Sequence, residues 1–403
     1  MGLISDLEAK DKKGVFRGND EYVTYPTGIL PLDYANGFWQ TITDSEGNVR
    51  NVPSLGIMGG TFGQVIGTTG SGKSTFAMQL GYSIIRKFED GVMYYIDTEK
   101  TALRQRVIQI TGADYDDPRI KIIKTATTIE DVLNLINDIC NAKEAGGNAY
   151  KYKIEDRSFN GKPMEVYVPT VFIIDSLPAF NSKDYNVEDL GNNIDQMRAA
   201  KDVTRFYTNC LDRAWHYNIS FIVVNHIRPK ADTNPYAAPP RGLMMLGPQE
   251  TLPRGSVAQF YSQWVIRINS KKSDSYTLDD NGFKGYKCIF ELAKSKQNTV
   301  GVKFPVAFIS DVGYDPVYTL YEFAQEIGII SGRNPYLYFE GLDTFKFNRK
   351  DFRRKFVEEE PFREAVLSIL RPYLEGLLSD QPEILSAKDK SNIIRFGDIS
   401  LNY

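Results

Sequence analysis

Short apolar runs alternate with amphipathic stretches along most of the chain from Gly63 onward. Each run is apolar almost throughout, without the alternation expected of a strand that has one solvent-exposed face. The predicted strands are Gln64–Gly67, Val92–Ile96, Ile120–Lys124, Val171–Ile174 and Phe221–Val224. The predicted helices are Ser74–Lys87, Ile129–Lys143 and about Ile194–Tyr217. Fully apolar strands separated by helices indicate an α/β fold whose mostly parallel sheet has helices on both faces.

The remaining stretches follow other patterns. After Trp264–Ile268, the strand-like stretches Lys287–Ala293 and Val302–Ile309 follow each other without a long helix, which predicts an antiparallel extension of the sheet. From about Gly332 the composition shifts toward Phe, Lys and Arg, and a helix is predicted near Pro361–Leu378. We therefore expect three parts. These are an N-terminal arm at 1–29 that would serve oligomerisation, with a brief helix near 3–10, a core at 30–331, and a small α-rich C-terminal appendage at 332–403.

Three local signals refine this outline. Thr127 and Glu130 have the spacing of a capping box at the start of the second predicted helix. The polar turn Asp44–Asn51 is flanked by apolar residues and predicts a hairpin. The insert 145–169 interrupts the alternation with Gly, Tyr and Lys residues and is predicted to be a surface hairpin, with no function assigned by its sequence.

The composition changes this picture mainly by exclusion. A net charge of −3 over 403 residues leaves room for a DNA-binding surface only as a local patch. Three well-separated cysteines without a CxxC pair argue against a disulfide scaffold and indicate a reducing cytosol. Two histidines are too few for a typical His/Cys zinc site. No apolar run approaches the length of a membrane span.

The strongest chemical signal is the glycine-rich loop, Gly67–Ser74, which follows a predicted strand and opens a predicted helix. It satisfies the G-x-x-x-x-G-K-[ST] spacing, in which glycines let successive backbone N–H groups turn toward phosphate oxygens. Lys73 would reach the β- and γ-phosphates of ATP, and the Ser74 hydroxyl would ligate Mg²⁺. The expected ATP-binding residues are Gly67, Thr68, Thr69, Gly70, Ser71, Gly72, Lys73, Ser74 and Thr75, with His226 from another strand.

Three other predicted strands also end in polar residues. Asp175 follows a buried strand and would hold the water shell of Mg²⁺, although an aspartate in this position can also cap a helix. Glu99 is our candidate for the group that orients the attacking water, the alternative being a solvated strand-end acid. Asn225-His226 would sense the γ-phosphate, and His226 could equally be a structural residue.

A long stretch without strand or helix pattern, Ala231–Leu252, contains four prolines and predicts a loop that lacks regular structure without a ligand. Basic side chains in or beside it would meet phosphates, and methionines would insert between bases. These residues are Lys230, Arg241, Arg254, Met244 and Met245. The alternative is a flexible active-site lid that contacts no nucleic acid.

The four strand ends follow one another in the order typical of the RecA recombinase family. The chain resembles that family from Thr27–Asp33 to about Gly332. The match to the UvsX-type phage recombinases is closer still, because it includes Asn225-His226, where bacterial RecA has Asn-Gln, and Pro361-Phe362-Arg363. The resemblance implies a RecA-like P-loop ATPase core in the cytosol of a bacterium or of a phage-infected host.

The resemblance also implies roles for individual residues. Glu99 corresponds to the catalytic glutamate, and His226 to the residue that couples the γ-phosphate to a DNA-binding loop. Lys294 and Lys296 match a lysine pair that reaches the nucleotide of the neighbouring subunit, although a lysine pair on a strand is more often a solvated edge.

Two stretches correspond to the DNA-binding loops of the family. The first is Ser182–Asn193, which contains Lys183. The second is Gly242–Tyr261, which contains Arg254 and Gly255. The base contact of the nucleotide cannot be assigned, because Arg106 or a neighbour stands where bacterial RecA has a tyrosine.

The sequence therefore predicts a DNA-dependent ATPase that acts as a recombinase. It would form filaments on single-stranded DNA and exchange strands with a homologous duplex, with single-strand-binding and loader proteins as further partners. The first alternative is a hexameric helicase of the same fold, which usually carries an N-terminal primase-interaction domain that does not fit before Gly63. The second is a recombination mediator that binds ATP and a partner without catalysing exchange.

Overall fold

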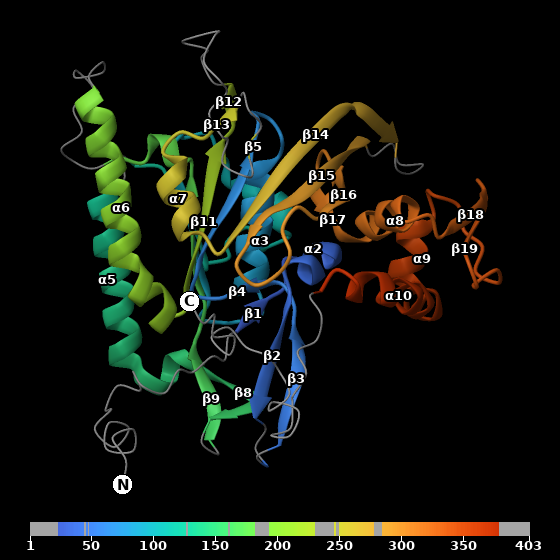
Figure 1. Ribbon diagram of the computed structural model, residues 1–403, viewed down its shortest axis with the longest axis horizontal. Coiled ribbons are helices and arrows are strands. Elements are labelled where there is room, and N and C mark those ends of the chain that lie inside the picture. Colours follow the sequence, from blue (N-terminus) through green and yellow to red (C-terminus); the bar gives the residue numbers. More distant parts are fainter. Residues whose placement is uncertain are drawn as a thin grey trace, which may run out of the picture.

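The computed structural model describes residues 23–43, 46, 48–125, 128–159, 162–181, 193–229, 246, 250–277 and 284–378. A nine-stranded sheet forms its centre, in the order β17–β16–β15–β14–β5–β11–β10–β6–β7 (Figure 1). The strands are β5 (Phe62–Gly67), β6 (Val92–Asp97), β7 (Ile120–Ile123), β10 (Thr170–Asp175), β11 (Ile219–His226), β14 (Trp264–Thr277), β15 (Lys284–Ser295), β16 (Lys303–Ile309) and β17 (Gly313–Asp315).

The direction of the strands divides the sheet into two parts. Strands β14, β5, β11, β10, β6 and β7 run parallel to one another. Strands β15, β16 and β17 continue from β14 as an antiparallel meander. The predicted α/β fold, with a mostly parallel sheet and an antiparallel extension, is confirmed at this level.

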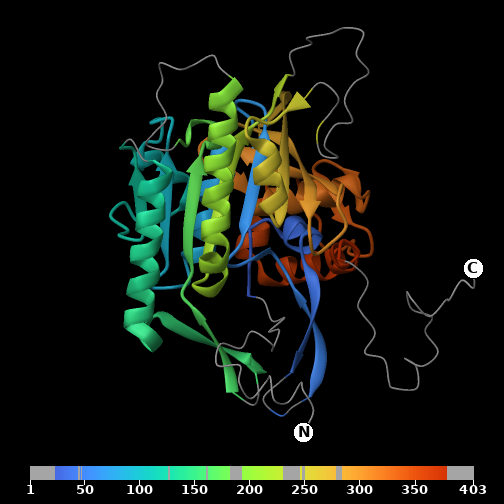
Figure 2. The same cartoon turned by 60° about the vertical axis from the view of Figure 1, so that its left-hand side comes forward.

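Helices cover both faces of the sheet, and a separate hydrophobic cluster lies under each face. Helices α3 (Lys73–Ile85) and α4 (Arg104–Thr111) pack in the first cluster, and α5 (Ile129–Gly146) and α6 (Asn193–His216) pack in the second (Figure 2). Every residue of β5 and β10 is buried, which explains why these strands lack an alternating pattern. Of these four helices, α4 alone was not predicted from the sequence pattern.

The capping box of α5 lies one residue later than predicted. Thr128, with extended backbone, is the N-cap residue, and its side chain accepts a hydrogen bond from the backbone N–H of Asp131 (3.2 Å). The Asp131 carboxylate in turn accepts from the N–H of Thr128 (3.0 Å). The predicted pairing of Thr127 with Glu130 is therefore wrong, because a shorter aspartate closes the box. Thr127 itself lies outside the described residues.

Two hairpins extend from the end of the sheet where the parallel strands begin (Figures 1 and 2). Strands β2 (Phe38–Thr43) and β3 (Val49–Ser54) form the first, and β8 (Lys151–Phe159) and β9 (Lys162–Tyr167) form the second. Both predicted hairpins are confirmed. A short strand pair at the same end joins β1 (Thr24–Tyr25) to β4 (Ile57–Met58). Another pair, β12 (Arg228–Pro229) with β13 (Glu250–Thr251), lies at the opposite end, after the carboxyl end of β11.

The C-terminal part of the described chain packs on the antiparallel side of the sheet. Its elements are α8 (Pro316–Glu326), β18 (Ile330–Arg333), β19 (Tyr336–Phe339), α9 (Phe352–Glu358) and α10 (Glu360–Glu375). Buried residues of α9 and α10 belong to the same hydrophobic cluster as α3, β15 and the short helix α2 (Leu30–Ala35). The helix predicted near Pro361–Leu378 is present as α10, and the division of the chain into domains stays a prediction.

Two further observations complete the fold. The helix predicted near residues 3–10 lies outside the described residues. Among the helices that the structure describes, none combines the length and the apolar character needed to cross a membrane.

Candidate functional site at the carboxyl ends of the parallel strands

The residues singled out at four strand ends meet at one edge of the sheet. In the pairing of β5 with β11, Gly67 lies opposite His226, and in the pairing of β10 with β6, Asp175 lies opposite Asp97. Since all four strands are parallel, their carboxyl ends share this edge, where ligands of open α/β sheets commonly bind.

The glycine-rich loop has a backbone that its glycines make possible. Gly70 and Gly72 have positive φ angles of 74° and 89°, which other residues rarely adopt. A Cβ atom on Gly72 would lie 2.3 Å from the hydroxyl of Tyr314, so the loop packs too closely there for any side chain. Thr68, Thr69 and Gly70 are exposed at the tip, and α3 begins directly after Gly72. The loop is therefore held in shape while its tip faces outward.

Lys73 is the buried cation of the site. Its side chain is only 4% exposed, and its ammonium donates one hydrogen bond, to the carbonyl of Thr68 (2.7 Å). Burial lowers the pKa of Lys73 to about 8, while the carboxylates of Asp175 and Glu99 act in the opposite direction. A buried ammonium with a single carbonyl acceptor has donor capacity left for an anionic ligand.

Asp175 contacts Ser74, the residue predicted to share a metal ion with it. Burial raises the pKa of Asp175, and hydrogen bonds from the hydroxyls of Ser74 and Tyr95 oppose this shift. The Tyr95 hydroxyl lies 2.6 Å from Oδ2 of Asp175. The structure thus brings together the hydroxyl and the carboxylate at the start of α3 and the end of β10.

Glu99 is held by two neighbours and is nevertheless partly open to solvent. Its Oε1 accepts a hydrogen bond from the Ser176 hydroxyl (3.1 Å) and lies 3.3 Å from Nε2 of His226. Burial, followed by the charge of Lys73, lowers the pKa of His226, while the carboxylates of Glu99 and Asp175 act in the opposite direction. The Glu99 side chain is 45% exposed, which leaves it access to water.

Several residues of this site carried no functional prediction. Thr98 joins the two acidic strand ends, because its hydroxyl donates to the carbonyl of Asp175 (2.8 Å) and accepts from the N–H of Ser176 (2.7 Å). Thr98 directly precedes Glu99 and Ser176 directly follows Asp175, so their places in the sequence could have indicated a role in the site. Tyr314, whose hydroxyl donates to the carbonyl of Ser71 (3.0 Å), comes from β17 and had no such signal.

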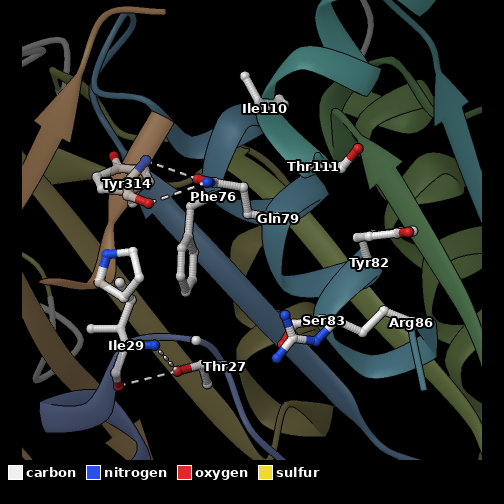
Figure 3. Close-up of a pocket in the computed structure, with 12 residues that line it drawn as sticks. Thr27, Ile29, Phe76, Gln79, Tyr82, Ser83, Arg86, Ile110, Thr111 and Tyr314 are labelled. Carbon is white, nitrogen blue, oxygen red and sulfur yellow. Dashed lines mark hydrogen bonds between the residues drawn. The ribbon is translucent and has the colours of Figure 1, made fainter. Parts of the chain in front are cut away.

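Figure 3 shows how Tyr314 is fixed. The Gln79 side chain on α3 accepts from the N–H of Tyr314 (2.9 Å) and donates to its carbonyl (3.2 Å). These residues line a pocket of about 230 Å³ along α3, with Arg86, Tyr82 and Thr27 also on its wall. None of the residues predicted for ATP or metal binding lines this pocket, so it is separate from the site at the strand ends.

Lys294 and Lys296 lie far from the glycine-rich loop of their own chain. Lys294 pairs with Val265 of β14, which pairs in turn with Gln64 near the start of β5. The ammonium of Lys294 donates to the carbonyls of Gln259 and Phe260 at the end of helix α7 (Gly255–Tyr261). Burial and the neighbouring Lys296 lower its pKa to about 8. The pair thus lies toward the opposite edge of the sheet from Gly67.

The residues predicted to contact DNA are only partly described. Lys183, Lys230, Arg241, Met244 and Met245 lie outside the described residues. Arg254 has a positive φ of 53°, and its guanidinium donates to the carbonyl of Phe180 and to Oδ1 of Asn181, both at 2.6 Å. It therefore connects the segment after β13 to the turn after β10. Gly255 is the first residue of α7.

The polar atoms of the site fit an anionic ligand with a cation. Among the described residues, the buried Oγ of Ser71 and Oδ1 of Asp97 have no hydrogen-bond partner. The Lys73 ammonium and the Ser71 hydroxyl offer donors that suit a phosphate chain, and carboxylates lie beside them. Within the part of the chain that the structure describes, no group of three or more His, Cys, Asp or Glu side chains is placed to hold a metal ion. No protein-family model and no curated protein matches the chain.

Proposed function

We propose that the chain binds ATP with Mg²⁺ on the glycine-rich loop, hydrolyses it, and thereby acts as a DNA recombinase built on a RecA-like P-loop ATPase core. The observation that carries the proposal is the convergence of Lys73, Ser74, Asp175, Glu99 and His226 at the carboxyl edge of one parallel sheet. Their predicted roles are phosphate binding, metal binding, positioning of water and sensing of the γ-phosphate, and they come from four separate segments of the chain.

The chain's own residues supply binding and orientation. The loop N–H groups and the Lys73 ammonium would hold the β- and γ-phosphates, and Ser74 with Asp175 would hold the metal ion. When bound, Mg²⁺ supplies neutralisation of charge on the phosphate oxygens. Glu99, partly exposed and fixed by Ser176, would position a water molecule for attack on the γ-phosphate.

His226 provides a route from the nucleotide to DNA. It contacts Glu99 and ends β11, and the next residue, Ile227, donates its N–H to the carbonyl of Gly67 (2.9 Å). The neighbouring Asn225 donates to the carbonyl of Pro253 (3.1 Å), the residue that follows the pattern-free stretch Ala231–Leu252. The residues on both sides of that stretch are thus hydrogen-bonded at the site, so we expect a change at Glu99 to reach both.

In this proposal ATP-bound subunits coat single-stranded DNA, pair it with a homologous duplex and exchange strands. Lys294 and Lys296 would complete the site of a neighbouring subunit, because they lie too far along the sheet to reach the loop of their own chain. Turnover would then require assembly.

The first experiment measures whether filling the nucleotide site changes the grip on DNA. We expect a non-hydrolysable ATP analogue to tighten binding to single-stranded oligonucleotides, and Lys73→Ala to abolish that response. Circular single strands mixed with homologous linear duplex should yield joint molecules. Unwinding of a fork without homology would indicate a helicase instead, and DNA affinity that ignores the nucleotide would refute the proposal.

A complementation experiment tests the shared site. Glu99→Gln subunits keep their lysines, and Lys294→Ala/Lys296→Ala subunits keep Glu99. Each variant alone should be nearly inactive as a DNA-stimulated ATPase, whereas a mixture should regain activity at interfaces that join an intact Glu99 to intact lysines. A mixture no more active than its components would contradict a site completed by a neighbour.

A further inference from the structure

A small sheet at the antiparallel end of the molecule presents an aromatic and basic surface that the proposed function does not use. Strands β18 and β19 form an antiparallel hairpin, and Leu337 of β19 is bridged to Phe347 by two hydrogen bonds of 2.8 Å. Phe347 thus lies beside β19 through an isolated antiparallel bridge. Figure 1 shows the hairpin at the outer edge of the molecule, away from β12 and β13.

The two faces of this sheet differ sharply. Phe339 and Phe347 are buried, and Leu337 packs against the hydrophobic core. Side chains alternate along a strand, so the intervening residues belong to the other face. Tyr336 is 68% exposed there, and Arg333 lies opposite it in the pairing of β18 with β19.

Two more residues extend this outer face. Tyr338 is half-buried. Its ring lies close to Gly332, where a Cβ atom would be only 3.2 Å from it. Lys346 is exposed and directly precedes Phe347, whose antiparallel bridge to Leu337 brings it next to the part of β19 that holds Tyr338. Among the described residues, no hydrogen bond, ion pair or ring contact engages the side chains of Tyr336, Tyr338, Arg333 and Lys346.

Carboxylates lie near this face but leave its positive groups unpaired. Glu340, which directly follows β19, accepts a hydrogen bond from the Ser331 hydroxyl (3.0 Å). Asp343 is exposed on the following turn. The guanidinium of Arg333 and the ammonium of Lys346 therefore remain on the same face as two tyrosine rings, which is the pattern of a surface that stacks bases and holds the phosphates between them.

We propose that this face, Arg333, Tyr336, Tyr338 and Lys346, is a second nucleic-acid contact that binds single-stranded polynucleotide without ATP. Tyrosines two residues apart on a strand are separated by about 7 Å, roughly twice the spacing of stacked bases. Each ring would thus take one base whose faces are free. A duplex offers no such faces along its length, so the surface selects unpaired strands. The inference extends the proposed function by a contact far from the nucleotide site.

The test uses the full chain, without nucleotide, and a fluorescent oligothymidylate. We expect Tyr336→Ala to weaken binding about tenfold, which corresponds to about 1.4 kcal/mol and lies within the range of one base–tyrosine stack. Tyr336→Trp should retain binding, because the stacking surface is kept. Tyr373→Ala is the matched control, since Tyr373 is an exposed tyrosine of α10 outside this face.

Two further measurements make the result specific. An abasic oligonucleotide of equal charge should bind equally to the parent and to Tyr336→Ala, because no base can stack. Oligonucleotides carrying photoreactive iodouracil should crosslink to Tyr336 or Tyr338, as mapped by mass spectrometry. Equal affinity of Tyr336→Ala and Tyr373→Ala for oligothymidylate, together with no crosslink on β19, would overturn the inference. Loss of the ATP response with a retained Tyr336 effect would refute the proposed function and leave this contact standing.

Discussion

Lys73 and Lys143 are two buried lysines at opposite ends of the same sheet, and they have different partners. Lys73 lies at the carboxyl ends of the parallel strands with one carbonyl acceptor. Lys143, on α5, donates to the carbonyls of Val168 (2.7 Å) and Tyr217 (2.8 Å), which precede β10 and β11. Burial lowers both pKa values, to about 8 for Lys73 and about 7 for Lys143.

The difference shows how a buried cation can be assigned a role. Lys143 uses its donors on two fixed carbonyls, and the other ionisable group that acts on its pKa is the thiol of Cys140. It therefore ties α5 to the starts of two strands. Lys73 has donors to spare and lies beside two carboxylates, so it is poised for a ligand. Burial is common to both lysines, and hydrogen-bond partners distinguish them.

The largest effect that separates the two lysines should be on catalysis. We expect Lys73→Ala to lower DNA-stimulated ATP turnover by about 10²- to 10³-fold, because a preorganised charge at the phosphates is lost. Lys143→Met, which also removes a buried ammonium, should keep turnover per folded subunit within about twofold. Steady-state phosphate release, normalised to folded protein, checks both values. Equal losses in the two variants would mean that Lys73 acts through stability alone.

The second effect should be on stability, where the Lys143 variant should lose more than the Lys73 variant. Lys143→Met leaves two partly buried carbonyls without this donor, so we expect the free energy of unfolding to fall by about 2 kcal/mol. Lys73→Ala should change it by less than about 1 kcal/mol. Urea unfolding followed by circular dichroism gives both values, with Lys121→Met on the exposed side of β7 as the control. A Lys143→Met variant as stable as that control would remove the structural role.

A pH series should sharpen the contrast at Lys73. Under the proposed function, a bound triphosphate would favour the charged ammonium, so we expect the pKa of Lys73, about 8 in the free chain, to rise on binding. Affinity is then nearly constant below pH 8 and falls as pH rises above it, by up to about tenfold per unit. Titrations with a fluorescent ATP analogue from pH 7 to 9.5 measure this. Lys294→Ala should keep the same profile, and a flat profile in the parent would contradict the assignment.

The smallest effect concerns Ser71, whose buried hydroxyl oxygen has no partner among the described residues. Because no hydrogen bond is lost, Ser71→Ala should change the free energy of unfolding by less than about 0.5 kcal/mol. If the hydroxyl serves the nucleotide, affinity for ATP should fall by about three- to tenfold, the usual range for one neutral hydrogen bond. Unchanged affinity would show that the orphaned oxygen has no part in binding.

The sequence predicted the parts of the site that depend on short-range pattern. Glycine spacing and a following helix were enough to place Lys73 and Ser74 together, and apolar runs that end in acids brought Asp175 and Glu99 to the same edge. Parallel strands explain this success, since their carboxyl ends must share an edge.

Contacts across long sequence separations were missed for a physical reason. The bond from Tyr314 to Ser71 spans 243 residues, and it depends on an antiparallel turn whose register no local pattern specifies. The hydrogen bond from Asn225 to Pro253 was also missed, because it joins residues on either side of a long stretch without a strand or helix pattern. The error at the α5 cap was different: Thr127 and Thr128 are adjacent, and only backbone geometry chooses between them.

Lys294 lies level with the first half of β5, whereas the glycine-rich loop begins at Gly67, the last residue of β5. Under the proposed function, this separation determines how copies of the chain can join. Each subunit then carries half of a site at either end, so contacts are head to tail and every subunit faces the same way. An open chain ends in one loop that no neighbour completes, whereas a closed ring leaves none. Activity per subunit should therefore rise with the length of an open assembly and then level off, because the single incomplete site becomes a smaller fraction of all sites.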